Sequence, residues 1–305
     1  MSDRHIVVGA GAVGRQLASH LAERGSWVTV VSRSGTDTGI AGVEHVALDA
    51  ADADQLTEVV KGADVLHNCA NARRYTEWVK MWPPLAASLL VTAERTGATY
   101  AITGNLYPYG PVNEPMTELL PDVATDRKGR LRAAMWADAL AAHREGRVRV
   151  VEVRGADYIG SGVGANGHVT RHLATLRAGK RAWVVGSADQ PHSFTDVADV
   201  ARLLVAAAED EAAHGRVWHV PSNAPRTQRQ VIADVACAGG FPEPKVSAVP
   251  GAVLALGSVV PFLREVREMS YQWTRPYVLD DTASREHFGI DPTPWDEVCR
   301  RTAAG

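Results

Sequence analysis

Six residues near the start of the chain, Gly9-Ala10-Gly11-Ala12-Val13-Gly14, follow the pattern Gly-x-Gly-x-x-Gly. The apolar run Ile6-Val7-Val8 precedes them, and a helical pattern over 15–23 follows. In this context Gly9 permits a tight turn, Gly11 lets the backbone approach a pyrophosphate, and Gly14 allows close packing of helix on strand. The segment predicts a dinucleotide-binding turn with the anion at a helix N-terminus. A strand–helix turn without a ligand is the alternative.

Short β-branched runs alternate with helical patterns over the first two thirds of the chain. The predicted strands are 5–9, 27–31, 43–48, 65–69, 99–103 and 148–153, and the predicted helices are 14–24, 53–60, 75–95 and 129–144. Apolar strands separated by helices are typical of a parallel sheet that is covered on both faces. The predicted fold class is therefore α/β, a Rossmann-type doubly wound parallel sheet.

Beyond Gly155 glycine and proline become dense and the alternation weakens. Further strands are predicted at 182–185 and 217–220, and further helices at 195–208, 227–238 and 295–302. We predict a dinucleotide-binding domain over 1–155, joined by about 190–215, and a smaller C-terminal substrate-binding lobe formed by 156–189 and 216–305. A second glycine pattern, 162–167, lies nine residues beyond Val153 and is interpreted as a flexible loop over the site.

The second predicted strand ends in Ser32-Arg33-Ser34, about 20 residues after the glycines. A chain that prefers NAD(H) would place an acidic residue here to bind the ribose 2′-hydroxyl. Arg33 instead suits a 2′-phosphate, because a guanidinium pairs with phosphate oxygens in a fork. This segment predicts NADP(H) in preference to NAD(H). The alternatives are that Arg33 stacks on the adenine or is only solvated.

Five further segments carry a family resemblance. They are Leu48-Asp49-Ala50, His67-Asn68-Cys69-Ala70, Thr103-Gly104-Asn105-Leu106-Tyr107-Pro108-Tyr109-Gly110, Arg154 with Asp157-Tyr158-Ile159-Gly160, and Phe194-Thr195-Asp196-Val197-Ala198-Asp199-Val200. With the glycine turn, they resemble the short-chain dehydrogenase/reductase superfamily in its extended and atypical branch, the NAD-dependent epimerase/dehydratase type. The resemblance implies cofactor contacts at Asp49, Ala50, Cys69, Ala70 and Thr103.

The chain departs from this family at the proton-transfer residues. Asn105 stands where relatives have a serine or threonine that holds the substrate oxygen. The best match to the family's Tyr-x-x-x-Lys is Lys128-Gly129-Arg130-Leu131-Arg132, and no tyrosine lies between Tyr109 and Tyr158. Arg132 can bind ribose and supply positive charge but cannot release a proton. Lys128 is a general acid if its basic neighbours depress its pKa, or else a solvated surface group.

Three tyrosines are candidate replacements for the missing proton donor: Tyr75, Tyr107 and Tyr109. Tyr107 and Tyr109 follow the fifth predicted strand, at the sheet edge where ligands bind. The alternative for each is packing against the cofactor or the lobe interface. Asp157, Tyr158 and His192 are assigned with Tyr75 and Tyr109 to the substrate, although His192 also suits a capping or packing position. Aromatic residues at 75–82 and 271–277 suggest an apolar pocket or ordinary core.

Composition and spacing exclude several other classes. Lys+Arg total 32 against 35 Asp+Glu, a net charge of −3, which gives no case for nucleic acid or an anionic membrane. The three cysteines suit a reducing cytoplasm. The apolar stretch Val249–Leu263 is broken by prolines and shorter than the ~18 residues that suggest a span, so we expect a lid or core element. His168 and His172 lack a third ligand, so no metal is predicted.

We predict an NADP(H)-dependent atypical short-chain oxidoreductase that acts on a small carbonyl, alcohol, enone or sugar-like substrate. Its candidate catalytic residues are Asn105, Tyr107, Lys128 and Arg132. One alternative is a redox-inert NADP-binding sensor or regulator, since the Tyr–Lys pair is replaced. Another is a non-redox epimerase, dehydratase or cyclase on the same fold. The resemblance also implies a possible homodimer through the helices 75–95 and 129–144.

Overall fold

The computed structural model describes residues 3–72, 75–249 and 268–305 of the chain. Most of the apolar stretch Val249–Leu263, expected to form a lid or core element, lies outside the described residues. No helix in the described ranges is long and apolar enough to cross a membrane.

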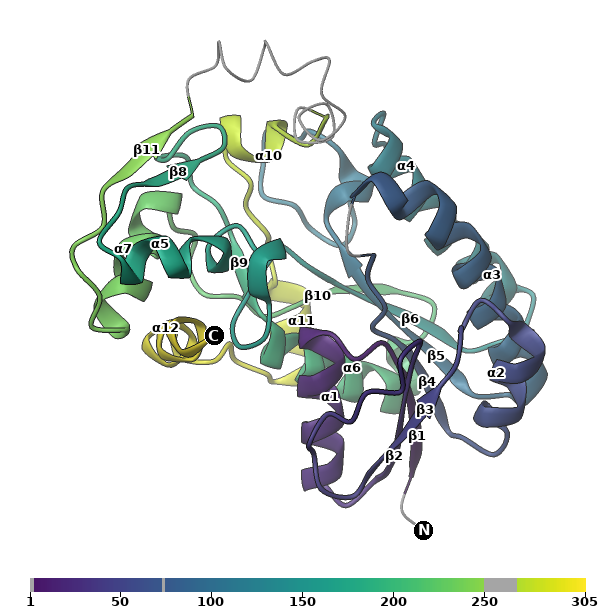
Figure 1. The fold of residues 1–305 in the computed structure, drawn as a ribbon. Coiled ribbons are helices and arrows are strands. Elements are labelled where there is room, and N and C mark those ends of the chain that lie inside the picture. Colours follow the sequence, from purple (N-terminus) through teal and green to yellow (C-terminus); the bar gives the residue numbers. More distant parts are fainter. Residues whose placement is uncertain (1–2, 73–74, 250–267) are drawn as a thin grey trace.

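A seven-stranded sheet forms the centre of the molecule (Figure 1). Its strands, in spatial order, are β10 (Val217–His219), β6 (Val150–Gly155), β5 (Thr99–Asn105), β4 (Val65–Asn68), β1 (Arg4–Val8), β2 (Trp27–Ser32) and β3 (Val43–Ala47). Every neighbouring pair is parallel. The strand order reverses between β4 and β1, and such a switch point opens a crevice at the carboxyl ends of the strands. The predicted α/β class and doubly wound topology are confirmed.

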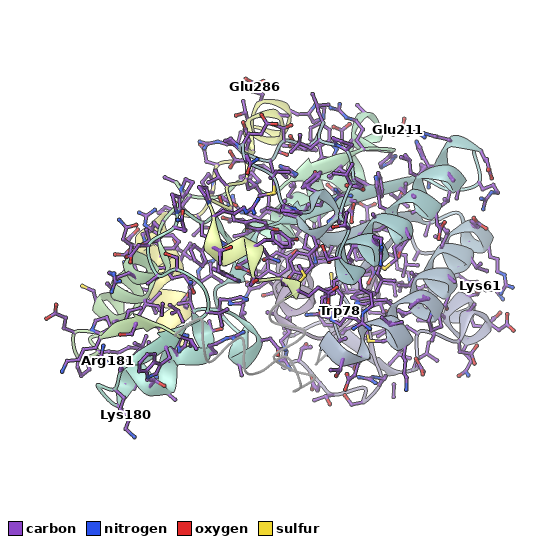
Figure 2. All side chains as sticks on the ribbon, turned by 90° about the horizontal axis from the view of Figure 1, so that it is seen from above. Lys61, Trp78, Lys180, Arg181, Glu211 and Glu286 are labelled. Atoms are coloured by element: carbon purple, nitrogen blue, oxygen red, sulfur yellow. The ribbon has the colours of Figure 1, made fainter. Side chains whose placement is uncertain are left out.

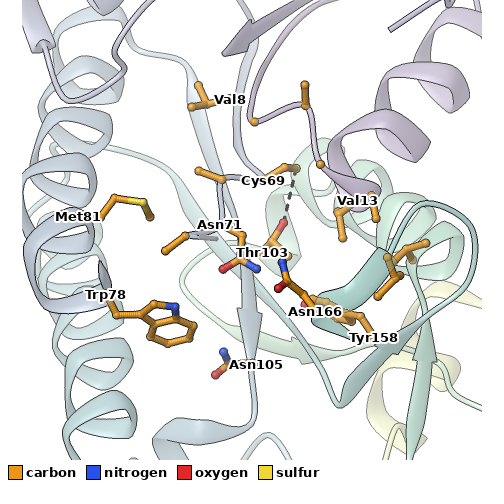
Figure 3. Close-up of a pocket in the computed structure, with 18 of the residues that line it drawn as sticks. Val8, Val13, Cys69, Asn71, Trp78, Met81, Thr103, Asn105, Tyr158 and Asn166 are labelled. Atoms are coloured by element: carbon orange, nitrogen blue, oxygen red, sulfur yellow. Dashed lines mark hydrogen bonds between the residues drawn. The ribbon is translucent and has the colours of Figure 1, made fainter. Parts of the chain in front are cut away.

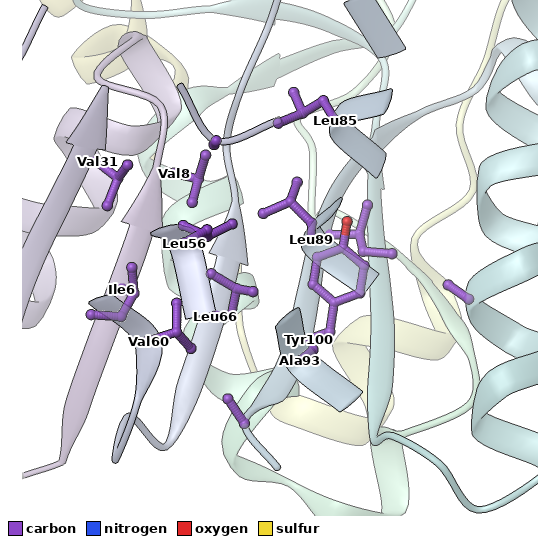
Figure 4. Close-up of a cluster of buried hydrophobic side chains, with 14 of the residues drawn as sticks. Ile6, Val8, Val31, Leu56, Val60, Leu66, Leu85, Leu89, Ala93 and Tyr100 are labelled. Atoms are coloured by element: carbon purple, nitrogen blue, oxygen red, sulfur yellow. The ribbon is translucent and has the colours of Figure 1, made fainter. Parts of the chain in front are cut away.

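Helices cover both faces of this sheet. Their bounds are α1 (Ala12–Glu23) and α6 (Val197–Glu209) on one face, and α2 (Ala53–Val60), α3 (Trp78–Thr96) and α4 (Arg127–Arg144) on the other. Side chains alternate between the two faces of a strand. Accordingly Ile6 and Val8 pack with Leu56 and Leu89 in one cluster (Figure 4), whereas Val7 packs in a second cluster under α1 and α6.

The second lobe has a smaller core. It contains α5 (Leu173–Arg177), α7 (Gln228–Ala238), α12 (Trp295–Ala304) and a parallel pair formed by β8 (Ala182–Val184) and β11 (Val246–Ala248). A further parallel pair joins β7 (Asp157–Ile159) to β9 (Phe194–Asp196). The remaining short elements are η1 (Tyr75–Glu77), η2 (Tyr107–Tyr109), η3 (Gly164–Asn166), η4 (Thr170–His172), η5 (Glu211–Ala213), α10 (Tyr271–Thr274) and α11 (Thr282–Phe288).

Two elements depart from the ranges expected from the sequence. The strand Val217–His219, expected in the smaller lobe, pairs with β6 at the edge of the large sheet. Its Trp218 is buried in the cluster under α1 and α6, so burial of this side chain accounts for the position. The helix expected over 75–95 begins only at Trp78, after the turn η1. Figure 2 shows Trp78 inside the molecule, while charged side chains such as Lys61 and Glu286 extend outward.

Candidate functional site

A cavity of about 1850 Å³ lies along the carboxyl ends of the strands (Figure 3). It begins at the turn between β1 and α1, passes the ends of β4 and β5, and reaches the loop over residues 162–171. Pockets for one drug-sized ligand measure about 300–1000 Å³. The cavity therefore has room for a dinucleotide and a second small molecule together.

The glycine turn has the geometry that a pyrophosphate needs. Gly9 has a φ of +112°, and a Cβ there would lie 2.6 Å from the carbonyl oxygen of Cys69. A Cβ on Gly14 would lie 1.9 Å from the carbonyl oxygen of Gly9, so α1 packs directly on the turn. A Cβ on Gly11, by contrast, would meet no other part of the structure within 4 Å, and no side chain caps α1. The first backbone N–H groups of α1 are thus left to a ligand, and an anion fits there.

The other predicted cofactor residues fall into two groups. Nearly all of them line the cavity: Gly9, Gly11, Ala12, Val13, Ser32, Arg33, Ser34, Asp49, Ala50, Cys69, Ala70 and Thr103. Gly14 does not line it, because it is buried between helix and strand. The Arg33 side chain is exposed and makes no hydrogen bond or ion pair within the described parts of the chain. Its guanidinium is therefore available to a ligand at the end of β2.

Cys69 lies beneath the cavity and is not a nucleophile in this setting. Its Sγ accepts a hydrogen bond from Thr103 Oγ1 at 3.6 Å (Figure 3). Burial raises the pKa of the Cys69 thiol to about 12. A thiol must ionise to attack a substrate, so Cys69 is a packing residue of the cavity floor.

Asn105 and Tyr107 lie at the centre of the cavity. Asn105 Oδ1 accepts a hydrogen bond from the backbone N–H of Tyr107 at 3.1 Å. This contact leaves the amide NH2 of Asn105 to donate to a ligand. The ring of Tyr107 stacks on Trp78 with 6.0 Å between centroids and 24° between planes. The turn η2 and α3 together hold the Tyr107 ring at the cavity wall.

Arg132 is a buried cation on the same wall. Its guanidinium lies 4.0 Å from the ring centroid of Trp82 and 5.1 Å from that of Trp78. Nε and Nη1 have no hydrogen-bond partner among the residues described. Burial lowers the pKa of Arg132, while Glu152 and the neighbouring tyrosines, Tyr107 included, act against this shift. An arginine keeps its proton even so, which leaves an unsatisfied positive charge near Tyr107.

Lys128 is not brought to the cavity. Its Nζ donates to Glu268 Oε2 at 2.6 Å, and the lysine side chain is 2% exposed. The interpretation of Lys128 as a solvated surface group is therefore wrong. Burial favours the neutral form of Glu268, but the ion pair with Lys128 outweighs it and lowers the pKa of this carboxyl. The contact joins α4 to a segment 140 residues further along the chain, which a motif match does not reveal.

The structure separates the predicted tyrosines. Tyr158 lines the cavity, and its hydroxyl donates to the carbonyl oxygen of Gly104 at 2.5 Å. Tyr109, assigned to the substrate, is instead buried away from the cavity, with its hydroxyl 2.8 Å from His219 Nε2. The turn η2 accounts for this difference, because it directs Tyr107 and Tyr109 to opposite sides. The Tyr75 side chain lies outside the described residues.

A polar group lies at the far end of the cavity, in the second lobe. Asp157, His168 and Arg171 line this end together with Tyr277. His192 lies behind them, fully buried, with Nε2 at 2.7 Å from Asp157 Oδ2. His192 Nδ1 donates to the carbonyl oxygen of Gln272 at 3.1 Å, since a carbonyl can only accept.

Aromatic stacking holds the two histidines of this group. Trp273 stacks on His192 with 3.9 Å between ring centroids, and on His168 with 4.1 Å. Burial lowers the pKa of His168 to about 4, so its imidazole is neutral at neutral pH. For Asp157, burial acts to raise the pKa, but His168 and His192 outweigh it and lower the value. Asp157 is therefore a carboxylate that faces the cavity.

Sequence reasoning missed part of this group. The sequence pattern singles out His168 only as a possible metal ligand and gives no reason to single out Arg171. The available signal was the glycine pattern 162–167, which ends directly before His168. Residues 162, 163 and 165–167 of that loop do line the cavity. Because this loop reaches the cavity, the residues that directly follow it, His168 and Arg171, also lie beside the cavity.

Residues 5–220 of the chain match the model of the NAD dependent epimerase/dehydratase family. None of the curated proteins matches the chain. Among solved structures, UDP-glucose 4-epimerase from Thermotoga maritima, with UDP-glucose, has a TM-score of 0.81 at 17% identity, over 99% of this chain and 97% of that one.

Two further structures are similar over nearly the whole chain. The dTDP-glucose 4,6-dehydratase from Bacillus anthracis, in complex with NAD, has a TM-score of 0.79 at 13% identity, over 99% of this chain and 96% of that one. UDP-N-acetylglucosamine 4-epimerase from Methanobrevibacter ruminantium, in complex with UDP-N-acetylmuramic acid, has a TM-score of 0.80 at 15% identity, over 100% and 98%. These similarities extend the shared fold through the second lobe.

Proposed function

We propose that this chain, which belongs to the NAD-dependent epimerase/dehydratase family, is an NADP(H)-dependent oxidoreductase of the atypical short-chain type. Epimerases and dehydratases are enzymes, so the chain is a member of an enzyme family. The observation that carries the finer proposal is the continuous cavity. It joins the glycine turn to Asn105, Tyr107 and Arg132, three residues that can replace the missing Tyr–Lys pair.

In the proposed mechanism, a bound nicotinamide supplies or accepts the hydride. Asn105 Nδ2 donates a hydrogen bond to the oxygen of the substrate. Tyr107 gives its hydroxyl proton to that oxygen in the direction of reduction and takes it back in oxidation. Arg132 stabilises the phenolate of Tyr107 by its charge, because a buried cation acts strongly where water is excluded. Arg132 also supplies donors to the ribose hydroxyls of the cofactor.

The preference for NADP(H) rests on the residues at the end of β2. Arg33 is exposed at the cavity, and Ser32 and Ser34 flank it with hydroxyl groups. A 2′-phosphate would accept charge-assisted hydrogen bonds from the guanidinium. The 2′-hydroxyl of NAD is uncharged, so its hydrogen bond to the guanidinium would be weaker. Two of the similar solved structures are in complex with NAD, so the proposed preference for NADP(H) would be a difference between this chain and them.

The substrate is proposed to lie between Tyr107 and the far end of the cavity, against the second lobe. Asp157 can accept a hydrogen bond from a substrate hydroxyl, and Arg171 and His168 can donate one. Tyr158 packs at the boundary of the two lobes. A carbonyl or alcohol on a small, sugar-like molecule fits these groups, and relatives in complex with sugar nucleotides agree with this class.

The first test is Tyr107→Phe. We expect NADPH consumption with a panel of small aldehydes and hydroxyketones to fall by about 10²- to 10⁴-fold, the usual contribution of a proton-transferring group. Affinity for NADPH should stay unchanged, as measured by fluorescence titration. The matched control is Tyr109→Phe, which removes a hydroxyl from the same turn but on the side of His219. Equal turnover in Tyr107→Phe and the wild type would refute the assignment.

The buried ion pair of Lys128 favours a second candidate, a redox-inert NADP-binding regulator. In relatives the residue at this position is a tyrosine that transfers a proton, but here Lys128 is held by Glu268 away from the cavity. A regulator would bind NADPH and turn over none of the panel. A non-redox epimerase, dehydratase or cyclase would form product from sugar-like substrates without net consumption of NADPH, which mass spectrometry of the reaction detects.

We also propose a cytoplasmic homodimer. Val79 on α3 is 46% exposed and offers apolar surface to a second copy. Among the apolar residues of α3 and α4, Leu85 and Leu89 are buried within the subunit, and Met81, Leu131, Met135 and Leu140 pack partly against the same cluster. These six residues therefore give most of their surface to the core of their own subunit. Light scattering after gel filtration measures the oligomeric state.

A further inference from the structure

The amino end of β1 carries a separate cluster of possible metal ligands. Asp3, His5 and Glu209 each offer one ligand atom, and these atoms all lie within 4.8 Å of one another. No other group of this kind occurs in the described ranges. Asp3 directly precedes β1, His5 lies in β1, and Glu209 is the last residue of α6. The cavity lies at the carboxyl ends of the strands, so this cluster is at the opposite edge of the sheet, near the N-terminus in Figure 1.

His5 has one ring nitrogen satisfied and one that is not. The residue is fully buried, and its Nδ1 lies 3.1 Å from Nε2 of His67. His5 Nε2 has no hydrogen-bond partner in the part of the chain that the structure describes. A buried polar atom without a partner is costly and uncommon. Histidines that bind metals usually have their other ring nitrogen bonded to a second group, and His67 occupies that position here.

The charges around His5 favour a cation. The carboxylates of Glu209, Asp3 and Asp64 all lie near the buried ring of His5. Arg24 is a cation that lies near His5 as well. It bonds Glu209 through Oε2 at 3.0 Å, which leaves Oε1 available. The carboxyl end of α6 adds negative potential at the same point.

We propose that Asp3, His5 and Glu209 bind a divalent transition-metal ion, with Zn²⁺ as the best fit. An imidazole ligand favours zinc over magnesium or calcium, which prefer oxygen alone. Tetrahedral zinc places neighbouring ligand atoms about 3.4 Å apart, so the two exposed carboxylates would move inward by roughly 1 Å. Water would complete the coordination. The ion would join β1 to α6 and stabilise the folded chain, far from the hydride-transfer site.

The test uses Zn²⁺ alone as the probe, on the full chain without a histidine tag and after treatment with a chelator. Isothermal titration is expected to give one ion per chain, and the melting temperature should rise with Zn²⁺ concentration. Asp3→Asn and Glu209→Gln should each weaken binding at least tenfold, and His5→Gln should abolish it. The matched control is Glu211→Gln, an exposed carboxylate two residues beyond Glu209, which should bind Zn²⁺ like the wild type.

Two results would overturn the proposal. One is the absence of saturable Zn²⁺ binding by the wild-type chain. The other is binding that survives Asp3→Asn and Glu209→Gln unchanged, because the ion would then lie on other histidines. Both variants change exposed side chains, so they remain informative even if His5→Gln fails to fold. Affinity for NADPH should be the same with and without Zn²⁺, since the two sites lie at opposite edges of the sheet.

Discussion

The two ends of the cavity are built in different ways. At the cofactor end, the shape comes from backbone: Gly9 turns the chain, Gly14 brings α1 against it, and Gly11 leaves open space. At the substrate end, the shape comes from side chains that are distant in sequence. Asp157 contacts His192, and the rings of His192 and His168 both pack on Trp273.

This difference predicts that the substrate end tolerates substitution better than the cofactor end does. A backbone turn that holds a pyrophosphate has few sequence solutions, because any Cβ at Gly9 or Gly14 would overlap main-chain atoms. A side-chain site can be rebuilt from other residues on the same frame, so one fold serves many substrates. The comparison predicts that changes at one end leave the other end intact.

The largest expected effect is at Gly14. Gly14→Ala places a methyl group 1.9 Å from the carbonyl oxygen of Gly9, so α1 must move away from the turn. We expect a loss of about 1–3 kcal/mol of stability, the usual cost of overpacking. NADPH affinity should fall by at least a hundredfold, because the helix N-terminus no longer faces the pyrophosphate. Thermal unfolding and fluorescence titration measure the two effects.

Gly11→Ala sharpens this test. Gly11 has a φ of −80°, and a Cβ there would meet nothing within 4 Å, so the added methyl should leave stability unchanged. It would still occupy the space that the pyrophosphate approaches, and NADPH affinity should fall. Wild-type affinity in Gly11→Ala would show that the cofactor does not approach this turn.

The cofactor end was largely predictable from sequence, since its requirements are local. A positive φ at Gly9, a close contact at Gly14 and a strand that ends at Ser32, directly before Arg33, each depend on a few neighbouring residues. The parallel sheet was predictable for the same reason, because each strand and helix shows its own periodicity. The three-residue strand Val217–His219 was placed in the wrong lobe, since so short a pattern does not specify its partner.

The substrate end was not predictable, because its contacts join residues far apart in the chain. Asp157 meets His192 from another element, and His192 Nδ1 bonds the carbonyl oxygen of Gln272, 80 residues further along the chain. The sequence suggested Asp157 and His192 separately, but nothing in it showed that their side chains meet. Such contacts form where loops from different elements converge, and the hydrophobic periodicity of a single helix or strand does not predict them.

Asp157→Asn tests whether the two ends are independent. The change keeps the size of the side chain and removes its charge. We expect the KM for a hydroxylated substrate to rise by about tenfold to a hundredfold, the cost of weakening a hydrogen bond to a charged group. NADPH affinity should not change. Steady-state kinetics and fluorescence titration separate the two quantities.

The matched control is Asp189→Asn, an exposed carboxylate in the same lobe that pairs with Arg229. It should leave KM unchanged. If Asp157→Asn weakens NADPH binding as much as substrate binding, the cavity does not divide into two ends, and the comparison fails.

Arg33→Ala probes the cofactor end alone. Because the guanidinium is exposed, its pairing with a 2′-phosphate is partly screened, and we expect about a tenfold loss of NADP⁺ affinity. NAD⁺ lacks this phosphate, so its affinity should stay the same and serves as the internal control. Titration of the variant and the wild type with both nucleotides gives the ratio of NADP⁺ affinity to NAD⁺ affinity. An equal loss for NAD⁺ and NADP⁺ would place Arg33 on the adenine, the alternative considered from the sequence.

The smallest expected effect concerns the pH dependence of stability at the substrate end. His168 has a pKa of about 4 in the folded chain, lowered by burial from 6.5. Between these values the unfolded chain binds a proton that the folded chain does not, so stability falls as pH decreases from 6.5 toward 4. The slope from one such histidine is at most about 1.4 kcal/mol per pH unit. His168→Gln should remove this contribution, which urea unfolding at several pH values measures.

His172 and His219 also have lowered pKa values of about 4, so part of the slope should remain in the variant. An unchanged slope in His168→Gln would mean that His168 is charged in the folded chain, and then the far end of the cavity would attract anions rather than accept neutral hydroxyl groups.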